Sequence, residues 1–491
     1  MISSFAEQVT NLQRLAPELV LCFFGILIMV VDPFVGAARK KSMGWLGLVG
    51  SVVALVSIRC AGVNPGAAYS DLMRVDRFSV FVHYIVVGAA ILAILGSLNY
   101  LEDEGIQRGE FYALILFATA GMGIMAGANE LITAFVGLEM SSIATYVLVG
   151  FRRRALKSNE ASLKYFLLGS FATAFFLYGI AMVYGATGST KMDAVQAVLR
   201  GAGSSVPAIA MLGLALIFVG LGFKVVIAPF QIYGPDVYEG APTPVTALLA
   251  SAPKAATFAL MLRIFYVAFG SAGHLWFWAI WISAVLTMFI GNLAALAQTN
   301  VKRMLAYSSI AHAGYILVAF AASTDLGIAA VLFYLAAYVL MKVGAFLVVT
   351  HLGQQGEKRL ELQDYAGMST KQPVLSACFS LFLLSLLGLP ATAGFLGKFF
   401  AFQSALDVRN PWIVWLVVIA AINSVIGAYY YLRVIIAMYF WAPAQDYAPT
   451  AVAPALTTAL VIASAGTLYL GLLPGRILTL AKAAADSLAL R

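Results

Sequence analysis

Residues 216–230 read LIFVGLGFKVVIAPF, an apolar run that contains one charge, Lys224, and one helix breaker, Pro229. The same combination of a lysine and helix breakers recurs in TALLASAPKAATFALML at 246–262, with Lys254, and in LGLPATAGFLGKFFAF at 387–402, with Lys398. A charged side chain near the centre of a bilayer costs about 2.5–3.5 kcal/mol on insertion scales, and such side chains usually mark an ion or proton route. The retention of three such lysines predicts a membrane-spanning protein in which they are functional.

The composition is that of a membrane protein. Of the 491 residues, 62% are hydrophobic and only 11% are charged, and the mean hydropathy is +0.92. Soluble domains contain about 25% charged residues. The net charge of +8 falls in short segments between apolar runs, so it does not indicate nucleic-acid binding. Cys22, Cys60 and Cys378 lie in apolar segments without CxxC spacing, which argues against a disulfide framework and against an iron–sulfur site.

The apolar runs predict an all-α membrane protein with a single polytopic domain over residues 1–491. A membrane crossing needs about 20 mostly apolar residues, and fourteen runs meet this requirement. They cover approximately residues 15–35, 43–62, 78–99, 110–128, 130–150, 161–186, 207–232, 243–269, 275–297, 303–322, 326–350, 374–404, 411–440 and 452–473.

Basic residues between the runs predict the orientation. They follow the first, fifth, ninth and eleventh runs, so they share one side of the membrane if all fourteen runs cross it. These residues are Arg39, Lys40, Lys41, Arg152, Arg153, Arg154, Lys157, Lys302, Arg303, Lys358, Arg359 and Lys371. Since short basic loops stay in the cytoplasm, we expect both termini on the outer side. Residues 474–491 place apolar side chains at helical spacing, which predicts an amphipathic tail on the outer membrane surface.

The helix breakers predict interior polar sites. Pro229 lacks the N–H that would bond to the carbonyl of Val225, and Pro390 interrupts the twelfth run before Lys398. In lipid, a free carbonyl must bond to protein or water. We therefore expect broken helices at the seventh and twelfth runs, with a hydrated pocket beside each lysine. Proline kinks that only shape packing are the alternative.

The spacing of the polar residues predicts an internal duplication. Glu139 precedes Lys224 by 85 residues, and His312 precedes Lys398 by 86. Each pair joins a polar residue in an intact run to a lysine in a broken run two runs later. Five-helix repeats offset by an odd number of crossings have inverted topology, as in many transporters. The two antiporter-like repeats would cover about residues 110–269 and 275–440.

Glu139 and Lys224 form a candidate switch. If the Glu139 carboxylate and the Lys224 ammonium lie about 7 Å apart, at an effective dielectric constant near 20, their attraction is roughly 2.4 kcal/mol. A small movement of Glu139 relative to Lys224 can thus decide whether the buried lysine holds or releases a proton. A static ion pair that fixes helix packing is the alternative.

Three further residues extend this constellation. Lys254, thirty residues after Lys224, is a candidate next station in a relay. His312, in YSSIAHAGYILVAF, is either a relay residue or a hydrogen-bonded packing residue, and Lys342, in AAYVLMKVGAFLVV, is a secondary candidate. We find no GxGxxG after a strand, no P-loop, no cysteine cluster and no histidine pair spaced for haem. The pattern favours ion movement and gives no indication of electron transfer in this chain.

Four stretches carry a resemblance to a known family. They are GLGFKVVIAPFQIYGPDVYEGAPTPVTALLASAPKAATFAL, QTNVKRMLAYSSIAHAGY, GLPATAGFLGKFFAF and FVGLEMSSIATYVLVGF. They closely resemble the antiporter-like membrane subunits of proton-pumping NADH–quinone oxidoreductase, respiratory complex I. The resemblance extends from about residue 15 to about residue 475.

This resemblance implies a proton route through Glu139, Lys224 and Lys254, with Lys398 as the outward station and His312 matching the histidine of the tenth crossing. Lys342 does not align to a family role. The resemblance implies no cofactor in this chain, because flavin and iron–sulfur clusters belong to the peripheral arm and quinone binds where the arms meet. The implied partners are the other membrane-arm and peripheral-arm subunits, and the implied location is the bacterial inner membrane.

Two other functions fit the same residues. A subunit of a multi-subunit cation/proton antiporter would share the fold and the lysines without redox coupling. A structural scaffold would only brace neighbouring pumping subunits, and its buried lysines would tolerate substitution.

Overall fold

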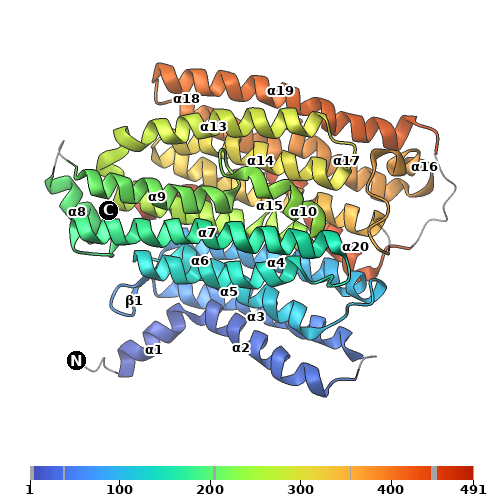
Figure 1. Cartoon of the computed structure of the whole chain (residues 1–491), viewed down its shortest axis with the longest axis horizontal. Coiled ribbons are helices and arrows are strands. Elements are labelled where there is room, and N and C mark those ends of the chain that lie inside the picture. Colours follow the sequence, from blue (N-terminus) through green and yellow to red (C-terminus); the bar gives the residue numbers. More distant parts are fainter. Residues whose placement is uncertain (1–4, 37–38, 203–205, 354, 444–450, 490–491) are drawn as a thin grey trace.

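The chain folds into an elongated bundle of helices (Figure 1). The computed structural model describes all residues except 1–4, 37–38, 203–205, 354, 444–450 and 490–491. The longer helices are α2 (Ala16–Val31), α3 (Lys41–Val63), α4 (Arg77–Asp103), α5 (Gly109–Gly127), α6 (Leu131–Val149), α7 (Leu156–Thr187), α9 (Ala208–Val225), α13 (Gly273–Leu296), α14 (Val301–Ala321), α15 (Asp325–Leu352), α17 (Pro373–Leu387), α18 (Ala393–Leu406), α19 (Pro411–Phe440), α20 (Pro454–Leu472) and α21 (Gly475–Ala489).

Shorter elements connect these helices. They are α1 (Phe5–Arg14), α8 (Met192–Gly201), α10 (Gly234–Gly240), α11 (Thr243–Leu249), α12 (Ala252–Leu262), the π-helical turn Arg263–Ala268, α16 (Met368–Lys371), and the antiparallel strands β1 (Gly66–Ala68) and β2 (Met73–Val75). Of these, α11, α12 and the π-helical turn together form the apolar segment Thr243–Ala268, which corresponds to the run predicted at 243–269. The other short elements gave no separate signal in the sequence.

The predicted all-α membrane class is confirmed. In the described part of the chain, thirteen helical segments are long and apolar enough to cross a membrane. The sequence predicted fourteen runs, and the difference lies at 374–404, the run expected to be broken, where the structure has the two shorter helices α17 and α18. Gly388 adopts φ 98° at the end of α17, and Pro390 follows two residues later. Neither half alone has the length of a crossing.

The helices α9 and α17 end in the same way. After α9, Val226 takes the left-handed conformation (φ 61°), and the next N–H, that of Ile227, bonds to the carbonyl of Gly222. After α17, Gly388 is left-handed, and the N–H of Leu389 bonds to the carbonyl of Leu384. This is the Schellman pattern, which satisfies only part of the carbonyls at a helix end.

A network of ion pairs closes one end of the bundle, which we call the basic end; it carries residues 104–108, 150–155 and 355–361. Its centre is Glu357, whose carboxylate accepts hydrogen bonds from Tyr100 on α4 (2.8 Å), the backbone of Thr243 on α11 (2.7 Å) and Lys302 on α14 (2.7 Å). Arg152, which follows α6, lies 3.4 Å away. One carboxylate therefore ties four distant segments together. The hairpin β1–β2, α1 and α8 lie at the opposite end, on the left in Figure 1.

Replacing Glu357 by glutamine is expected to destabilise the protein by about 3 kcal/mol, because the fully buried Lys302 would lose its carboxylate partner. Burial raises the pKa of Glu357, but the charge and hydrogen bond of Lys302, together with Thr243 and Arg152, outweigh burial and hold the pKa below its usual range. The stabilisation is therefore present above the unfolded-state pKa of about 4.3 and is lost as the pH falls through the lower folded-state value.

Thermal unfolding in detergent at a series of pH values measures this effect. The midpoints of wild type and Glu357→Gln should differ most near neutral pH and converge at acidic pH. Glu102→Gln is the matched control, because Glu102 pairs with Lys41 at an exposed position and exposed pairs contribute about 0–1 kcal/mol. Equal midpoints for the two variants at neutral pH would contradict the role of Glu357.

The predicted tail at 474–491 corresponds to α21. Ala481, Ala484 and Leu488 are buried on one face of this helix, which packs against α4 and α15. The N–H of Phe78, at the start of α4, donates to the hydroxyl of Ser487 (3.1 Å). The bundle thus covers much of the apolar face, while Leu480 remains 49% exposed.

Candidate functional site

Glu139 lies midway along α6, where small residues allow close helix packing. A Cβ on Gly137 would come within 2.9 Å of the carbonyl oxygen of Gly121 on α5, so glycine is needed at this approach. Glu139 is half-buried, and its Oε1 is a buried acceptor without a hydrogen-bond partner in the described part of the structure. Such an acceptor costs free energy unless a donor or water reaches it.

Lys224 occupies the last turn of α9, before the break, and only 5% of it is exposed. Its ammonium donates to the hydroxyl of Ser142 on α6 (2.8 Å) and to that of Tyr165 on α7 (3.1 Å). Ser142 lies three residues after Glu139, on a neighbouring face of the same helix. Within the described residues, Lys224 makes no direct ion pair with Glu139, and its hydrogen-bond partners are these two hydroxyls.

Lys254 is fully enclosed on α12, directly after the interruption between α11 and α12. Its ammonium donates to the backbone carbonyl (2.6 Å) and to the hydroxyl (2.7 Å) of Ser309 on α14. The hydroxyl of Tyr338 on α15 donates to the same serine oxygen (2.7 Å). Lys254, Ser309 and Tyr338 thus form one hydrogen-bonded group.

Lys342, on α15, starts a second and longer hydrogen-bonded group. It is fully buried and donates to the carbonyl of Leu305 (2.6 Å) and to the hydroxyl of Ser308 (2.9 Å). Ser308 shares a short hydrogen bond with Tyr431 on α19, and Tyr431 contacts Nε2 of His312 (3.2 Å). Nδ1 of His312 lies 2.8 Å from the hydroxyl of Tyr334 (one of the tyrosines on α15). Lys342, the secondary candidate, is therefore linked to His312 through Ser308 and Tyr431.

Lys398 lies on α18, and its side chain turns back toward the gap between α17 and α18. Its ammonium donates to the carbonyl of Leu387 (2.8 Å), the last residue of α17, and to Ser424 on α19 (2.7 Å). It also lies 4.7 Å from the centre of the Tyr315 ring. The break thus supplies a carbonyl that the lysine satisfies.

The interruption that holds Lys398 depends on Gly394, the second residue of α18. A Cβ at this position would lie 1.8 Å from the carbonyl oxygen of Ser385 on α17, and the N–H of Gly394 donates to the hydroxyl of Ser385 (3.1 Å). The two half-helices therefore touch through backbone atoms.

These groups meet around α14. Ser308 and Ser309 are adjacent, and the His312 ring lies 5.3 Å from the ring of Tyr338 and 5.7 Å from that of Tyr315. The structure thus gathers Lys254, Lys342, Lys398 and His312 into one buried cluster. Glu139 and Lys224 form a separate region, and no hydrogen bond joins the two regions among the described residues.

Tyrosines make most of the links that the sequence did not reveal. Tyr334, Tyr338 and Tyr431 are buried with their hydroxyls hydrogen-bonded to other side chains. A tyrosine in an apolar helix usually finds a partner for its hydroxyl, which is a usable signal, but it does not identify the partner. Across the described residues, no group of three or more His, Cys, Asp or Glu side chains is placed to hold a metal ion.

A bundle of membrane-crossing helices with lysines buried along its interior defines a membrane transport protein. The family described as NADH:quinone oxidoreductase/Mrp antiporter, transmembrane, matches residues 128–427. This is more than half of the chain, and the chain belongs to this family. The resemblance predicted from the sequence is confirmed.

Relatives within the family are similar over nearly their whole length. NADH-quinone oxidoreductase subunit N 1 of Solibacter usitatus is 47% identical over 97% of both chains. NADH-quinone oxidoreductase subunit N 2 of Koribacter versatilis is 48% identical over 99% of both. These relatives support membership among the antiporter-like subunits.

Solved structures share the fold. A chain of respiratory complex I from Thermus thermophilus with bound aureothin is 35% identical, with a TM-score of 0.79 over 94% of this chain and 98% of that one. A chain of the Mrp complex from Dietzia sp. DQ12-45-1b has a TM-score of 0.84 over 97% of both chains, but at 20% identity it shows the fold alone.

Proposed function

We propose that this chain is a proton-translocating membrane-arm subunit of an NADH–quinone oxidoreductase. The observation that carries the proposal is the buried cluster of lysines, histidine and hydroxyls around α14, in a chain whose relatives are named subunit N. The other membrane-arm and peripheral-arm subunits are its partners. Electron transfer takes place in those partners, so this chain contributes to a translocase without a redox centre of its own.

The chemistry of the cluster suits proton exchange. None of its three lysines pairs with a carboxylate among the described residues. Burying an unpaired charge is costly. These pockets lack a carboxylate, so each lysine can be held there in its neutral form as well as in its charged form. A hydroxyl can accept one hydrogen bond and donate another, and a neutral histidine does the same through its two nitrogens. The line Lys342–Ser308–Tyr431–His312–Tyr334 can therefore pass a proton in either direction.

Glu139 and Lys224 form the second half of the proposed relay. A movement that brings Glu139 toward Lys224 stabilises the ammonium, and withdrawal favours its release of a proton. Ser142 and Tyr165 hold the ammonium between these events. The proposed relay requires water to bridge the gap between this region and the cluster around α14, and irregular backbone within a membrane protein commonly admits water.

The architecture extends this proposal. We take α17 and α18 together as one broken crossing, which makes fourteen crossings in total. The shared Schellman ends of α9 and α17 support two five-helix repeats, at about 110–269 and 275–440, with inverted topology. With an even number of crossings and cytoplasmic basic loops, both termini face the outer side of the bacterial inner membrane.

The orientation is tested by cysteine labelling in a background without Cys22, Cys60 and Cys378. A cysteine at Ala202, in the segment after α8, should react with an impermeant maleimide added to intact cells or spheroplasts. A cysteine replacing Arg153 should react only after permeabilisation, because it lies at the basic end. Labelling of position 153 from outside would reverse the orientation.

The transport role is tested by replacing Glu139 with glutamine, which preserves size and removes the titratable charge. NADH-driven acidification of inverted vesicles and NADH–quinone oxidoreduction should both fall several-fold, with the complex still assembled on native gels. Glu102→Gln, which alters an exposed carboxylate, should leave both rates unchanged. Full rates in an assembled Glu139→Gln complex would contradict the relay.

Copurification separates this function from its nearest rival. The family also includes Mrp antiporters, whose subunits work without a peripheral arm. Iron–sulfur subunits that copurify with this chain support the oxidoreductase. Their absence from an intact, sodium-extruding complex would favour the antiporter.

A further inference from the structure

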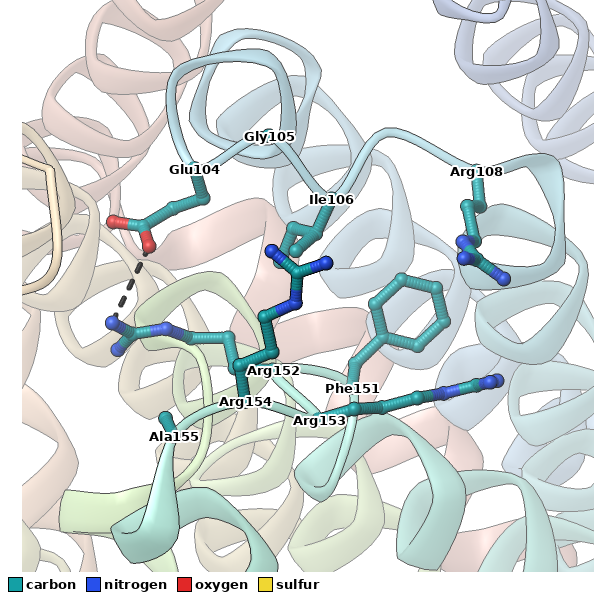
Figure 2. A pocket seen from close by; sticks show the side chains of 9 residues that line it. All are labelled: Glu104, Gly105, Ile106, Arg108, Phe151, Arg152, Arg153, Arg154 and Ala155. Atoms are coloured by element: carbon teal, nitrogen blue, oxygen red, sulfur yellow. Dashed lines mark ion pairs between the residues drawn. The ribbon is translucent and has the colours of Figure 1, made fainter.

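Arginines from two loops surround a cavity of about 430 Å³ at the basic end (Figure 2). One loop, 104–108, joins α4 to α5, and the other, 150–155, joins α6 to α7. The arginines that line the cavity are Arg108, Arg152, Arg153 and Arg154. The rule that basic loops stay in the cytoplasm explains why these loops are basic. The same rule does not explain why arginines more than forty positions apart in the sequence line one cavity.

The carboxylates beside the cavity are already engaged. Glu104, the one acidic residue in the lining, lies 3.3 Å from Arg152 (dashed line in Figure 2) and accepts a hydrogen bond from the N–H of Gly356 (2.6 Å). Arg153 lies 3.8 Å from Glu110. Arg108 and Arg154 have no carboxylate partner among the described residues. The cavity therefore has an excess of positive charge and available guanidinium donors.

The backbone adds to this positive field. α5 begins at Gly109, directly after Arg108, and α7 begins at Leu156, directly after Ala155, so two long helices start at the cavity. The partial positive charge at a helix N-terminus favours anions. The loop 104–108 is also held in place, because Gly105 takes a left-handed conformation and its N–H bonds to the carbonyl of Glu102. An anion would bind without first ordering these loops.

The position of the cavity indicates the source of the anion. The cavity lies at the starts of α5 and α7, which are both long and apolar enough to cross a membrane. Leu156, the first residue of α7, is 85% exposed. Arginine pairs with phosphate through two parallel N–H donors, and basic pockets on the cytoplasmic side of membrane proteins suit anionic headgroups. We propose that this cavity binds the phosphate group of an anionic phospholipid, and the inference does not depend on the proton-transport function.

The test uses the purified protein with the subunits that copurify with it, stripped of lipid by detergent exchange. It is equilibrated with mixed micelles containing labelled phosphatidylglycerol, and bound lipid is counted per protein. Arg108→Gln/Arg154→Gln should weaken binding about tenfold or more. The control Lys358→Gln/Lys371→Gln, which removes the same charge from the same end outside this cavity, should bind as wild type does. Phosphatidylcholine should bind weakly to all three proteins.

Each outcome decides the proposal. If the glutamine variant unfolds, Arg108→Lys/Arg154→Lys keeps the charge and should still weaken binding, because lysine lacks the paired donors. Inorganic phosphate that displaces the lipid at equal concentration would confirm the phosphate site but assign it to the free anion. Equal binding by wild type and the arginine variants would overturn the proposal. So would equal binding of phosphatidylcholine, or a crosslink from position 154 to an acidic segment of a neighbouring subunit.

Discussion

Replacing Lys224 by methionine is expected to lower proton pumping about tenfold or more, in line with the loss of a positioned proton-transfer group. The structure indicates that this change removes the charge of the side chain and leaves the packing around it intact. Methionine fills a similar volume, and Ser142, which loses the ammonium as a donor, still donates to the carbonyl of Leu138 (2.6 Å). Helix packing should therefore survive while the proton site is lost. Acidification of inverted vesicles, measured beside assembly on native gels, gives the result.

Arginine at this position distinguishes a relay from a fixed charge. Lys224→Arg keeps a positive charge but does not release its proton in the physiological range, so it should restore little pumping. Lys157→Met is the matched control, because Lys157, the second residue of α7, is largely exposed beside Glu239. Full pumping by an assembled Lys224→Met complex would favour the scaffold function instead.

The membrane class and most helix boundaries follow from the sequence because both depend on local physics. An apolar run long enough to cross a bilayer forms a helix whatever its neighbours are. The interruption after Leu387 has a local cause as well, in Gly388 and Pro390. These two residues predict the broken twelfth run, whereas hydropathy alone counts residues 374–404 as one crossing, since a window of average hydropathy runs across the break.

The candidate residues could be found from the sequence, but their partners could not. A lysine in an apolar run is conspicuous because its burial is costly, and this cost identified Lys224, Lys254 and Lys398. The residue of α6 that hydrogen-bonds to Lys224 is Ser142, one turn from Glu139, and Tyr165 on α7 is the second partner. Such a difference depends on the rotation of α6 against α9, which composition does not encode.

The tyrosines illustrate the same limit. Tyr431 joins Ser308 to His312, although it lies 119 residues beyond the histidine. That contact arises from the packing of α19 on α14. Lys342 likewise becomes part of the cluster only because α15 faces α14. Long-range packing, which has no local signature, thus decides which of the candidate residues work together.

Lys398 provides the second prediction with a large effect, because the structure answers the simplest objection to its role. A lysine near the end of a crossing can extend toward the nearer surface at little cost. Here the side chain instead reaches back eleven residues to the carbonyl of Leu387, and only 6% of the residue is exposed. Long side chains on a helix point toward its N-terminus, and the N-terminus of α18 faces the break.

Lys398→Met should therefore slow pumping about tenfold or more without disrupting assembly, since methionine occupies a similar volume. Lys398→Arg should slow it as well, because a group that stays charged cannot pass a proton on. Acidification rates in inverted vesicles, divided by the amount of assembled complex, compare the two. If arginine sustains full pumping while methionine abolishes it, the site needs only a fixed charge and the relay ends before α18. If both variants pump at the wild-type rate, the lysine only completes the hydrogen bonds of the broken helix.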